Sequence, residues 1–177
     1  MPRSSVEQIK EDEKKVIKKL LTDASESIDK IAKSCGFSRQ KVWRIMKRLE
    51  QNNTIWGYTA VIDHEKQNQN SYIVLIKKTS VPIGAIMEKI IQRDLEKKYA
   101  DKENIHIGES RYLNGIYDWV ICFTAKDIRE AKKFCNFLSQ LFEDHISEMH
   151  LLEDIFTVKK QGILNPNVNS LEEFKLP

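Results

Sequence analysis

Apolar positions in the first third of the chain recur every three or four residues, a spacing typical of amphipathic helices. The pattern predicts a helix over residues 6–21, a second short helix that begins after Ser27, and a third that begins after Ser38. Gly36 supplies a tight turn between the second and third helices. Three short helices with such a turn between the last two predict a helix-turn-helix unit.

The third predicted helix has two chemically different faces. Its apolar face is formed by Val42, Ile45, Met46 and Leu49. In a helix-turn-helix unit this helix enters the DNA major groove, where Arg and Gln read base edges and basic side chains neutralise phosphates. The residues that we expect to contact DNA occupy its start, its opposite face and its flanks: Ser38, Arg39, Gln40, Lys41, Trp43, Arg44, Lys47 and Arg48.

Trp43 lies among these basic residues, and two interpretations of it are open. It presses on a sugar or a thymine methyl group, or it packs partly against a neighbouring helix or wing. The face remains basic in either case.

Alternating apolar residues from Ile55 to Ile62 predict a strand that forms a wing or leads into a second domain. The polar segment 64–70 follows, and we expect a linker there. We therefore predict a helix-turn-helix domain with its connecting strand over residues 1–63 and a second domain over 71–161. Residues 162–177 are expected to form a C-terminal tail with little structure of its own.

The second domain is predicted to have the order βαββαβ, the split βαβ of a ferredoxin-like fold. Asn114-Gly115 is a dipeptide favoured in two-residue hairpin turns, and Gly108 is a candidate for a bulge. The fold class is thus α+β. The predicted strands cover residues 71–80, 104–113, 116–125 and 146–160, and the predicted helices cover 83–99 and 127–143.

Charge is distributed unevenly along the chain, although the formal net charge is only +3. Residues 1–63 carry 13 Lys and Arg against nine Asp and Glu, whereas residues 64–177 carry 16 against 17. Between Lys30 and Leu49 there are seven basic residues and no acidic one. Such a local field favours a polyanion, of which nucleic acid is the commonest example.

Other classes of function find little support in the sequence. It contains no GxSxG, P-loop or HExxH motif, so we expect neither an enzyme nor a metal site, and no cofactor. Its apolar runs are far shorter than the ~20 residues that span a bilayer, so no membrane partner is expected. The unclustered Cys35, Cys122 and Cys135 argue against a disulfide framework and for a cytoplasmic location.

The chain resembles the leucine-responsive and asparagine-responsive regulators, the Lrp/AsnC or feast/famine family. The resemblance covers roughly residues 7–160. It rests on IDKIAKSCGFSRQKVWRIMKRLE, on the following TIWGYTAVID, and on GIYD in the second domain, in this order and at this spacing. It implies a DNA-binding first domain and a second domain that dimerises and often binds an effector. Family members are dimers that frequently assemble further, commonly to octamers.

The resemblance also assigns individual residues. Gly115, Tyr117 and Asp118 match the family's Gly-x-Tyr-Asp loop, which lies near the effector pocket at subunit interfaces. Three departures are Ile45 where the family usually has Arg, Asn53 where it has Gly, and Ile116 where it is often acidic. The last weakens the case for an amino-acid effector, whose ammonium and carboxylate both need partners.

Asp118 lies on the apolar third predicted strand, and two roles for it are open. It caps the hairpin or accepts backbone donors at an interface, or it lines a ligand pocket.

Together these patterns predict a cytoplasmic, sequence-specific DNA-binding transcription regulator that acts as a homodimer or higher oligomer, with an effector as a further partner. One alternative is an architectural DNA-binding protein that oligomerises on double-stranded DNA without sensing a ligand. Another is a small-molecule-binding domain or enzyme with an accessory helix-turn-helix.

Overall fold

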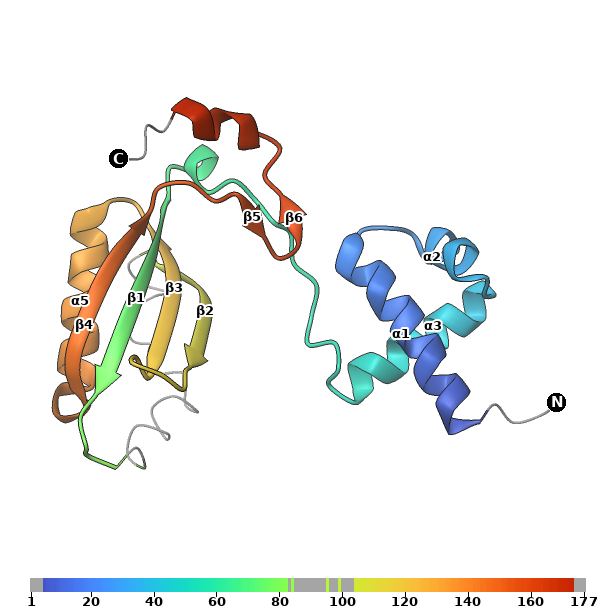
Figure 1. Ribbon diagram of the computed structural model, residues 1–177, viewed down its shortest axis with the longest axis horizontal. Helices are drawn as coiled ribbons and strands as arrows, with labels where there is room; N and C mark the ends of the chain where they lie inside the picture. The colour runs from blue at the N-terminus through green and yellow to red at the C-terminus, as the bar shows by residue number, and fades with distance from the viewer. Residues whose placement is uncertain (1–4, 83, 85–94, 96–98, 100–103, 174–177) are drawn as a thin grey trace. The chain divides into compact units, whose positions relative to one another are not determined.

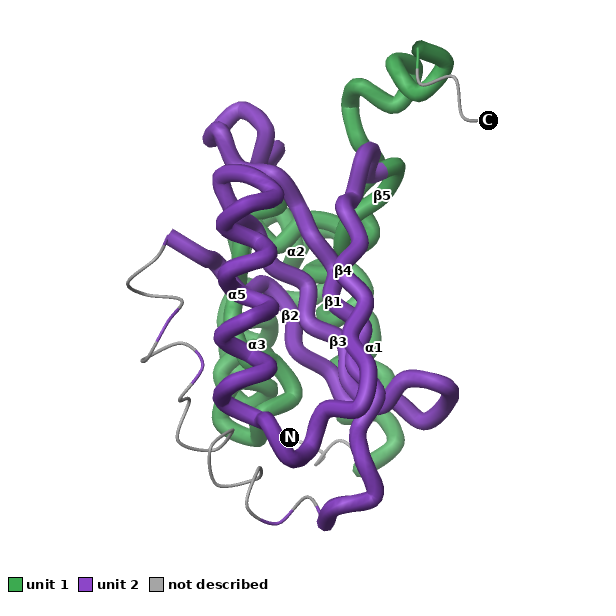
Figure 2. The backbone as a smooth tube through the Cα atoms, turned by 90° about the vertical axis from the view of Figure 1, so that its left-hand side faces the viewer, with its two compact units in different colours: residues 1–61, 158–177 green, residues 62–157 purple. Residues whose placement is uncertain are grey.

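The computed structural model describes residues 5–82, 84, 95, 99 and 104–173. The chain divides into two compact units, one formed by residues 1–61 with 158–177 and the other by residues 62–157 (Figure 2). Each unit is described by itself below.

Among its described residues the first unit contains three α-helices, as the sequence predicted. They are α1 (Val6–Thr22), α2 (Ile28–Cys35) and α3 (Arg39–Gln51) (Figure 1). Each begins after a serine whose side chain accepts a backbone N–H of the first turn: Ser5, Ser27 and Ser38. Gly36 ends α2 at φ 70°, in the left-handed region that its missing Cβ makes accessible.

The core of this unit is made by one face of each helix. Its buried residues are Val16 of α1, Ile31 and Ala32 of α2, and Val42, Ile45 and Leu49 of α3. The small Ala32 side chain lets α2 approach α3 closely, which suits a helix-turn-helix unit. This packing fixes which side of α3 faces outward.

The second unit is a four-stranded antiparallel sheet with α5 (Ile128–Leu141) on one face (Figure 1). The strands are β1 (Asn70–Lys78), β2 (His106–Tyr112), β3 (Trp119–Ala125) and β4 (Ile146–Asp154), in the spatial order β2-β3-β1-β4. This arrangement agrees with the predicted ferredoxin-like fold. The helix predicted over residues 83–99 lies mostly outside the described residues.

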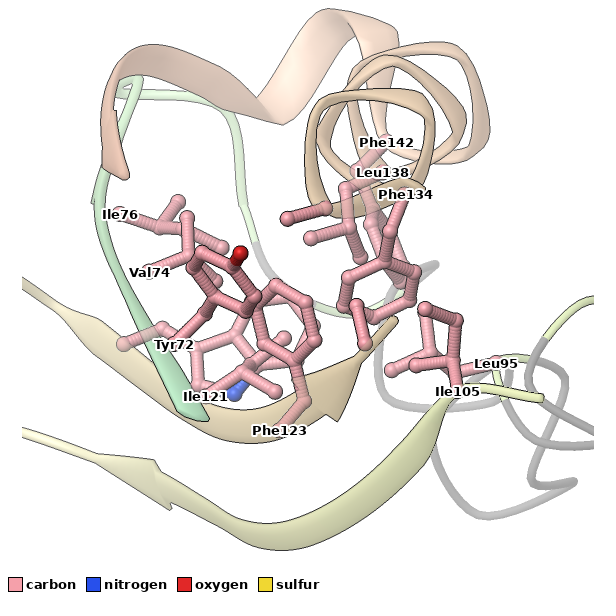
Figure 3. Close-up of a cluster of buried hydrophobic side chains, with 13 residues drawn as sticks. Tyr72, Val74, Ile76, Leu95, Ile105, Ile121, Phe123, Phe134, Leu138 and Phe142 are labelled. Carbon is pink, nitrogen blue, oxygen red and sulfur yellow. The ribbon is translucent and has the colours of Figure 1, made fainter. Parts of the chain in front are cut away.

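Alternate strand residues build the core between the sheet and α5. Tyr72 and Val74 of β1 and Ile121 of β3 are almost fully buried. Figure 3 shows Phe134 and Leu138 reaching from α5 toward these strand side chains. The residues between them along each strand therefore lie on the opposite face of the sheet.

Two local predictions about this sheet have different outcomes. The register between β2 and β3 shifts between Ile107 and Glu109, so the bulge predicted at Gly108 is confirmed. The two-residue turn at Asn114-Gly115 is wrong. Residues 113–118 form a longer loop, in which the Leu113 N–H donates to the Asp118 carbonyl at 2.8 Å.

The strand predicted over residues 55–62 is also wrong for the single chain. Residues 55–63 have no regular secondary structure, and no strand of the described chain pairs with them. A strand needs a neighbouring strand for its backbone hydrogen bonds, so alternation alone does not form one.

Asn53 adopts φ 58°, the left-handed conformation that asparagine can enter. The family that the sequence resembles has glycine at this position.

The C-terminal segment has more structure than the sequence suggested. It forms a small hairpin of β5 (Lys159–Lys160) and β6 (Ile163–Leu164), followed by the 3-10 helix η4 (Val168–Glu173). Short 3-10 turns also occur at η1 (Glu65–Gln67) and η3 (Glu143–His145). Within the residues that the structure describes, none of the helices is long and apolar enough to cross a membrane.

Candidate nucleic-acid interface

The start of α3 is fixed by hydrogen bonds of the preceding turn. The Phe37 N–H donates to the Ala32 carbonyl at 2.9 Å and closes the turn between α2 and α3. Ser38 Oγ then accepts the N–H of Lys41 at 3.3 Å. Ser38 thus has a structural role as the cap of α3, whatever further contact it makes.

The outward face of α3 is formed by Gln40, Trp43, Arg44 and Lys47, all of them exposed. Their spacing of three and four residues places them on one side of the helix. Trp43 keeps 51% of its surface exposed, which is unusual for so large an apolar side chain. We refer to these four residues as the outward face below.

Position 45, where the Lrp/AsnC family that the sequence resembles usually has Arg, faces the opposite way. Ile45 is 4% exposed and belongs to the core of the helical unit. The difference at this position therefore changes the core of the unit and leaves the charge of the outward face as it is.

Four basic residues of α3 form ion pairs, in two structural settings. Arg39 lies 3.7 Å from Asp29 of α2, and Lys47 lies 2.8 Å from Glu50 one turn later. Both pairs are solvent-exposed, so they are weak and easily exchanged for other anions. Arg44 makes no ion pair within the described part of the chain.

Lys41 and Arg48 lean toward α1 instead. Lys41 Nζ lies 2.6 Å from Asp12 Oδ2, and Arg48 Nε lies 2.7 Å from Glu13 Oε1. The Lys41 hydrogen bond lowers the pKa of the Asp12 carboxyl; burial opposes this shift, and a hydrogen bond from Gln8 adds to it. Lys41 and Arg48, which the sequence grouped with the other expected DNA contacts, are therefore bound within the protein.

A hollow of about 460 Å³ adjoins the C-terminal end of α3, lined by Glu50, Asn53, Ile55, Trp56, Gly57 and Tyr58. Trp56 is 95% exposed, and the Tyr58 hydroxyl donates to Glu50 at 3.2 Å. In the sequence these aromatic residues belonged to a strand pattern and to the TIWGYTAVID part of the resemblance, and neither assigned them to a site. Two large aromatic residues around a glycine in a segment without a helical period were the available signal.

The loop expected near an effector lies between β2 and β3. Gly115 is exposed, whereas Tyr117 and Asp118 are half-buried. Asp118 Oδ2 accepts the N–H of Lys78 at 2.9 Å, and the Tyr117 ring meets the ring of His150 at 5.6 Å, edge to face. The bond to Lys78 favours the first of the two roles considered for Asp118, and its role in a ligand pocket stays a prediction.

Other reactive groups are dispersed. Among the described residues, no cluster of three or more His, Cys, Asp or Glu side chains is arranged to hold a metal ion. The three cysteines are free thiols. Burial raises the pKa of the Cys135 thiol to about 11, which leaves it protonated and unreactive near neutral pH.

Comparison by sequence alone identifies no relative: no family model matches the chain, and no curated protein matches it. Solved structures do match. An AsnC family transcriptional regulator from Agrobacterium tumefaciens aligns with a TM-score of 0.62 at 19% identity, over 88% of this chain and 96% of that one. LrpC of B. subtilis aligns with a TM-score of 0.61 at 16% identity, over 90% and 99% of the two chains.

A transcriptional regulator from Neisseria meningitidis, solved in complex with L-Met, aligns with a TM-score of 0.64 at 13% identity, over 84% and 91% of the two chains. These alignments span both units of this chain and nearly the whole of each neighbour. They show that the chain has the fold of the AsnC and Lrp transcriptional regulators, as predicted from the sequence.

Proposed function

We propose that the chain is a member of the Lrp/AsnC family and acts as a sequence-specific, DNA-binding transcription regulator. The observation that carries the proposal is the outward face of α3. It presents an amide, an indole and two cations on one exposed side of a capped helix in a helix-turn-helix unit. Arg and Gln have the geometry to read guanine and adenine, and Lys neutralises phosphate.

We assign residues 1–63 to the DNA-binding domain, 64–70 to the linker, 71–161 to the dimerisation and effector domain and 162–177 to a C-terminal tail. Residues 158–177 group with the helical unit in the structure, so the compact units differ from this assignment at the C-terminal end. Two sequence motifs support this assignment: IDKIAKSCGFSRQKVWRIMKRLE in the helical unit and GIYD in the β2–β3 loop.

Self-association is supported by the face of the sheet that α5 does not cover. Ile73 and Leu75 of β1 lie on it with Leu152 of β4, which is 47% exposed. An apolar stripe of this kind on an open sheet face is a surface for a second copy. The unpaired segment 55–63 offers a second place where two copies can pair their backbones. We propose a homodimer, with further assembly toward an octamer as the family resemblance implies.

Sedimentation at micromolar concentration tests the dimer. Leu152→Asp places a charge on the open face and should shift the protein toward monomer. Leu164→Asp, at a leucine of β6 that is 57% exposed against 47% for Leu152, should not. If the wild type is a monomer, or if the Leu152→Asp variant is as dimeric as the wild type, the open sheet face is not the dimer interface.

The choice between a regulator and an architectural protein depends on discrimination between DNA sequences. The full chain is incubated with sheared DNA of its source genome and an excess of bulk competitor, and the retained fragments are sequenced. A regulator retains a small set of sites that share a motif. Uniform recovery of the genome would favour the architectural alternative, and turnover of a small molecule by the chain, which we do not expect, would favour the enzyme alternative.

A further inference from the structure

Two basic residues of α3 join it to α1 at two separate points. Lys41 Nζ lies 2.6 Å from Asp12 Oδ2, and Arg48 Nε lies 2.7 Å from Glu13 Oε1. The two basic residues are seven positions apart, so they share a side of α3 and are separated by about 10 Å along its axis. A helix held at two such points resists rotation about its crossing with α1.

The first of these pairs is the more buried. The Asp12 side chain is 5% exposed, and the Gln8 amide donates to its other oxygen at 3.0 Å. The Lys41 ammonium also lies 4.0 Å from the centre of the Phe37 ring, a favourable cation–π distance. Lys41 is therefore held by a carboxylate and an aromatic ring, both from its own unit.

This setting determines what Lys41 can do near DNA. If its ammonium moved to a phosphate, the buried carboxylate of Asp12 would lose its nearest counter-ion and keep only the Gln8 amide and the weaker attraction of Lys15. A buried charge without a close partner is destabilising. The exposed pair of Lys47 and Glu50 carries no such penalty, because solvent screens both groups. The two lysines of α3 are thus different in kind, although the sequence alone does not separate them.

We propose that Lys41 and Arg48 are positioning residues, whose ion pairs with α1 set the angle at which α3 enters the groove, and that neither contacts DNA. This inference rests on the proposed DNA-binding function. Base contacts require donor–acceptor distances of about 2.7–3.2 Å, so a tilt of α3 removes them first. Phosphate contacts are long-range and tolerate the same tilt. Loss of positioning therefore lowers discrimination more than it lowers general affinity.

The experiment compares Lys41→Gln with Lys47→Gln as the matched control in the full chain. Dissociation constants are measured against salt concentration for two duplexes: the consensus enriched by the wild type from a random library, and a scrambled duplex of the same length. Lys47→Gln should weaken binding to both and reduce the salt slope by about one. Lys41→Gln should leave the slope unchanged and reduce the ratio of the two affinities about tenfold, the size of one lost base contact.

Asp12→Asn separates positioning from charge. If Lys41 contacted DNA, removal of the Asp12 charge would free it and tighten binding to both duplexes. Under the proposal, Asp12→Asn loses discrimination as Lys41→Gln does, and the double variant is no worse than either single variant. A slope reduced by about one in Lys41→Gln, or tighter binding of the scrambled duplex by Asp12→Asn, overturns the proposal.

Folding is checked by circular dichroism and urea unfolding of every variant. A variant that only loses folded protein binds both duplexes less in equal proportion, and an unchanged affinity ratio in Lys41→Gln also overturns the proposal. If Asp12→Asn does not fold, the salt slope and the ratio of the two duplex affinities measured for Lys41→Gln still test the proposal. If the wild type enriches no consensus, the proposed function itself fails, which is a different outcome from failure of positioning alone.

Discussion

Asp118 Oδ2 lies 2.9 Å from the backbone nitrogen of Lys78, a residue 40 positions earlier in the chain. The Asp118 N–H in turn donates to the Ile76 carbonyl at 2.9 Å. These bonds tie the β2–β3 loop to the end of β1. The residue that the family resemblance assigns to an effector pocket is therefore also part of the scaffold of the sheet.

We expect Asp118→Ala to destabilise the fold by about 1–3 kcal/mol, because the Lys78 N–H loses a charged acceptor. Urea unfolding measures this loss. Asp118→Asn keeps an acceptor oxygen and should lose less. Equal stability of wild type and Asp118→Ala would show that the hydrogen bond contributes nothing.

The effector prediction concerns the chemistry of the same loop. Ile116, 79% exposed, stands where the family that the sequence resembles often has an acid, so the ammonium of an amino acid finds no carboxylate at this position. Every free amino acid carries this ammonium, so we expect either a less polar ligand or no ligand to stabilise the protein. A ligand at a hundred times its dissociation constant adds about 2.7 kcal/mol, which a thermal-shift panel of the twenty amino acids and common metabolites detects. A large shift with one amino acid, lost in Asp118→Ala or in Tyr117→Leu, would contradict the expectation.

The Asp12–Lys41 pair makes stability depend on pH in a defined direction. The pKa of Asp12 is lowered in the folded state relative to about 3.9 in the unfolded chain. Ionised Asp12 therefore contributes its full stabilisation to the folded state above pH ~4. This stabilisation is lost as the pH falls through the pKa of Asp12 in the folded state. Asp12→Asn should cost about 1–3 kcal/mol at pH 7, and the difference from wild type should narrow below pH ~4.

Urea unfolding of both proteins between pH 3 and 8 tests this prediction. Glu7→Gln, which changes an exposed acid in the first turn of the same helix, is the control and should follow the wild-type profile. If the difference in unfolding free energy between Asp12→Asn and wild type stays constant down to pH 3, ionised Asp12 is not the source of this pH dependence.

Ser38 provides a test of the capping role. Ser38→Ala should cost about 1 kcal/mol of stability, because the first turn of α3 loses the acceptor for the Lys41 N–H. Ser38→Asn keeps a side chain that is favoured at this position and should unfold close to the wild type. If both substitutions are neutral in chemical denaturation, the cap is not a source of stability.

The helical unit was predictable because its signals are local. Serine caps, a glycine at positive φ and a helical apolar period all act within a few residues, and Ser27, Gly36 and Ser38 were identified from them. The outward face of α3 followed from the same period. The role of Asn53 was also recognisable, since asparagine enters the left-handed region readily.

The predictions that were wrong, and the ion pair that was missed, depend on contacts between residues distant in sequence. The segment 55–62 alternates like a strand, but a strand forms only where a partner strand lies beside it. In place of the predicted two-residue turn at Asn114-Gly115, the chain forms a longer loop, which is held by the hydrogen bonds between Asp118 and β1. The pairing of Lys41 with Asp12 could not be inferred from α3 alone, since the acid lies on another helix.

We propose above that the outward face of α3 reads base sequence. The most direct measurement selects bound duplexes from one random library in parallel with wild type, Gln40→Ala and Lys47→Ala, and compares the enriched motifs. The wild-type motif should be symmetric, with half-sites about 10 bp apart or a multiple of it. Gln40→Ala should lose preference at one or two positions in each half-site, and Lys47→Ala should keep the motif with weaker binding. No enriched motif, or an identical motif with equal affinity in all three proteins, would contradict the claim.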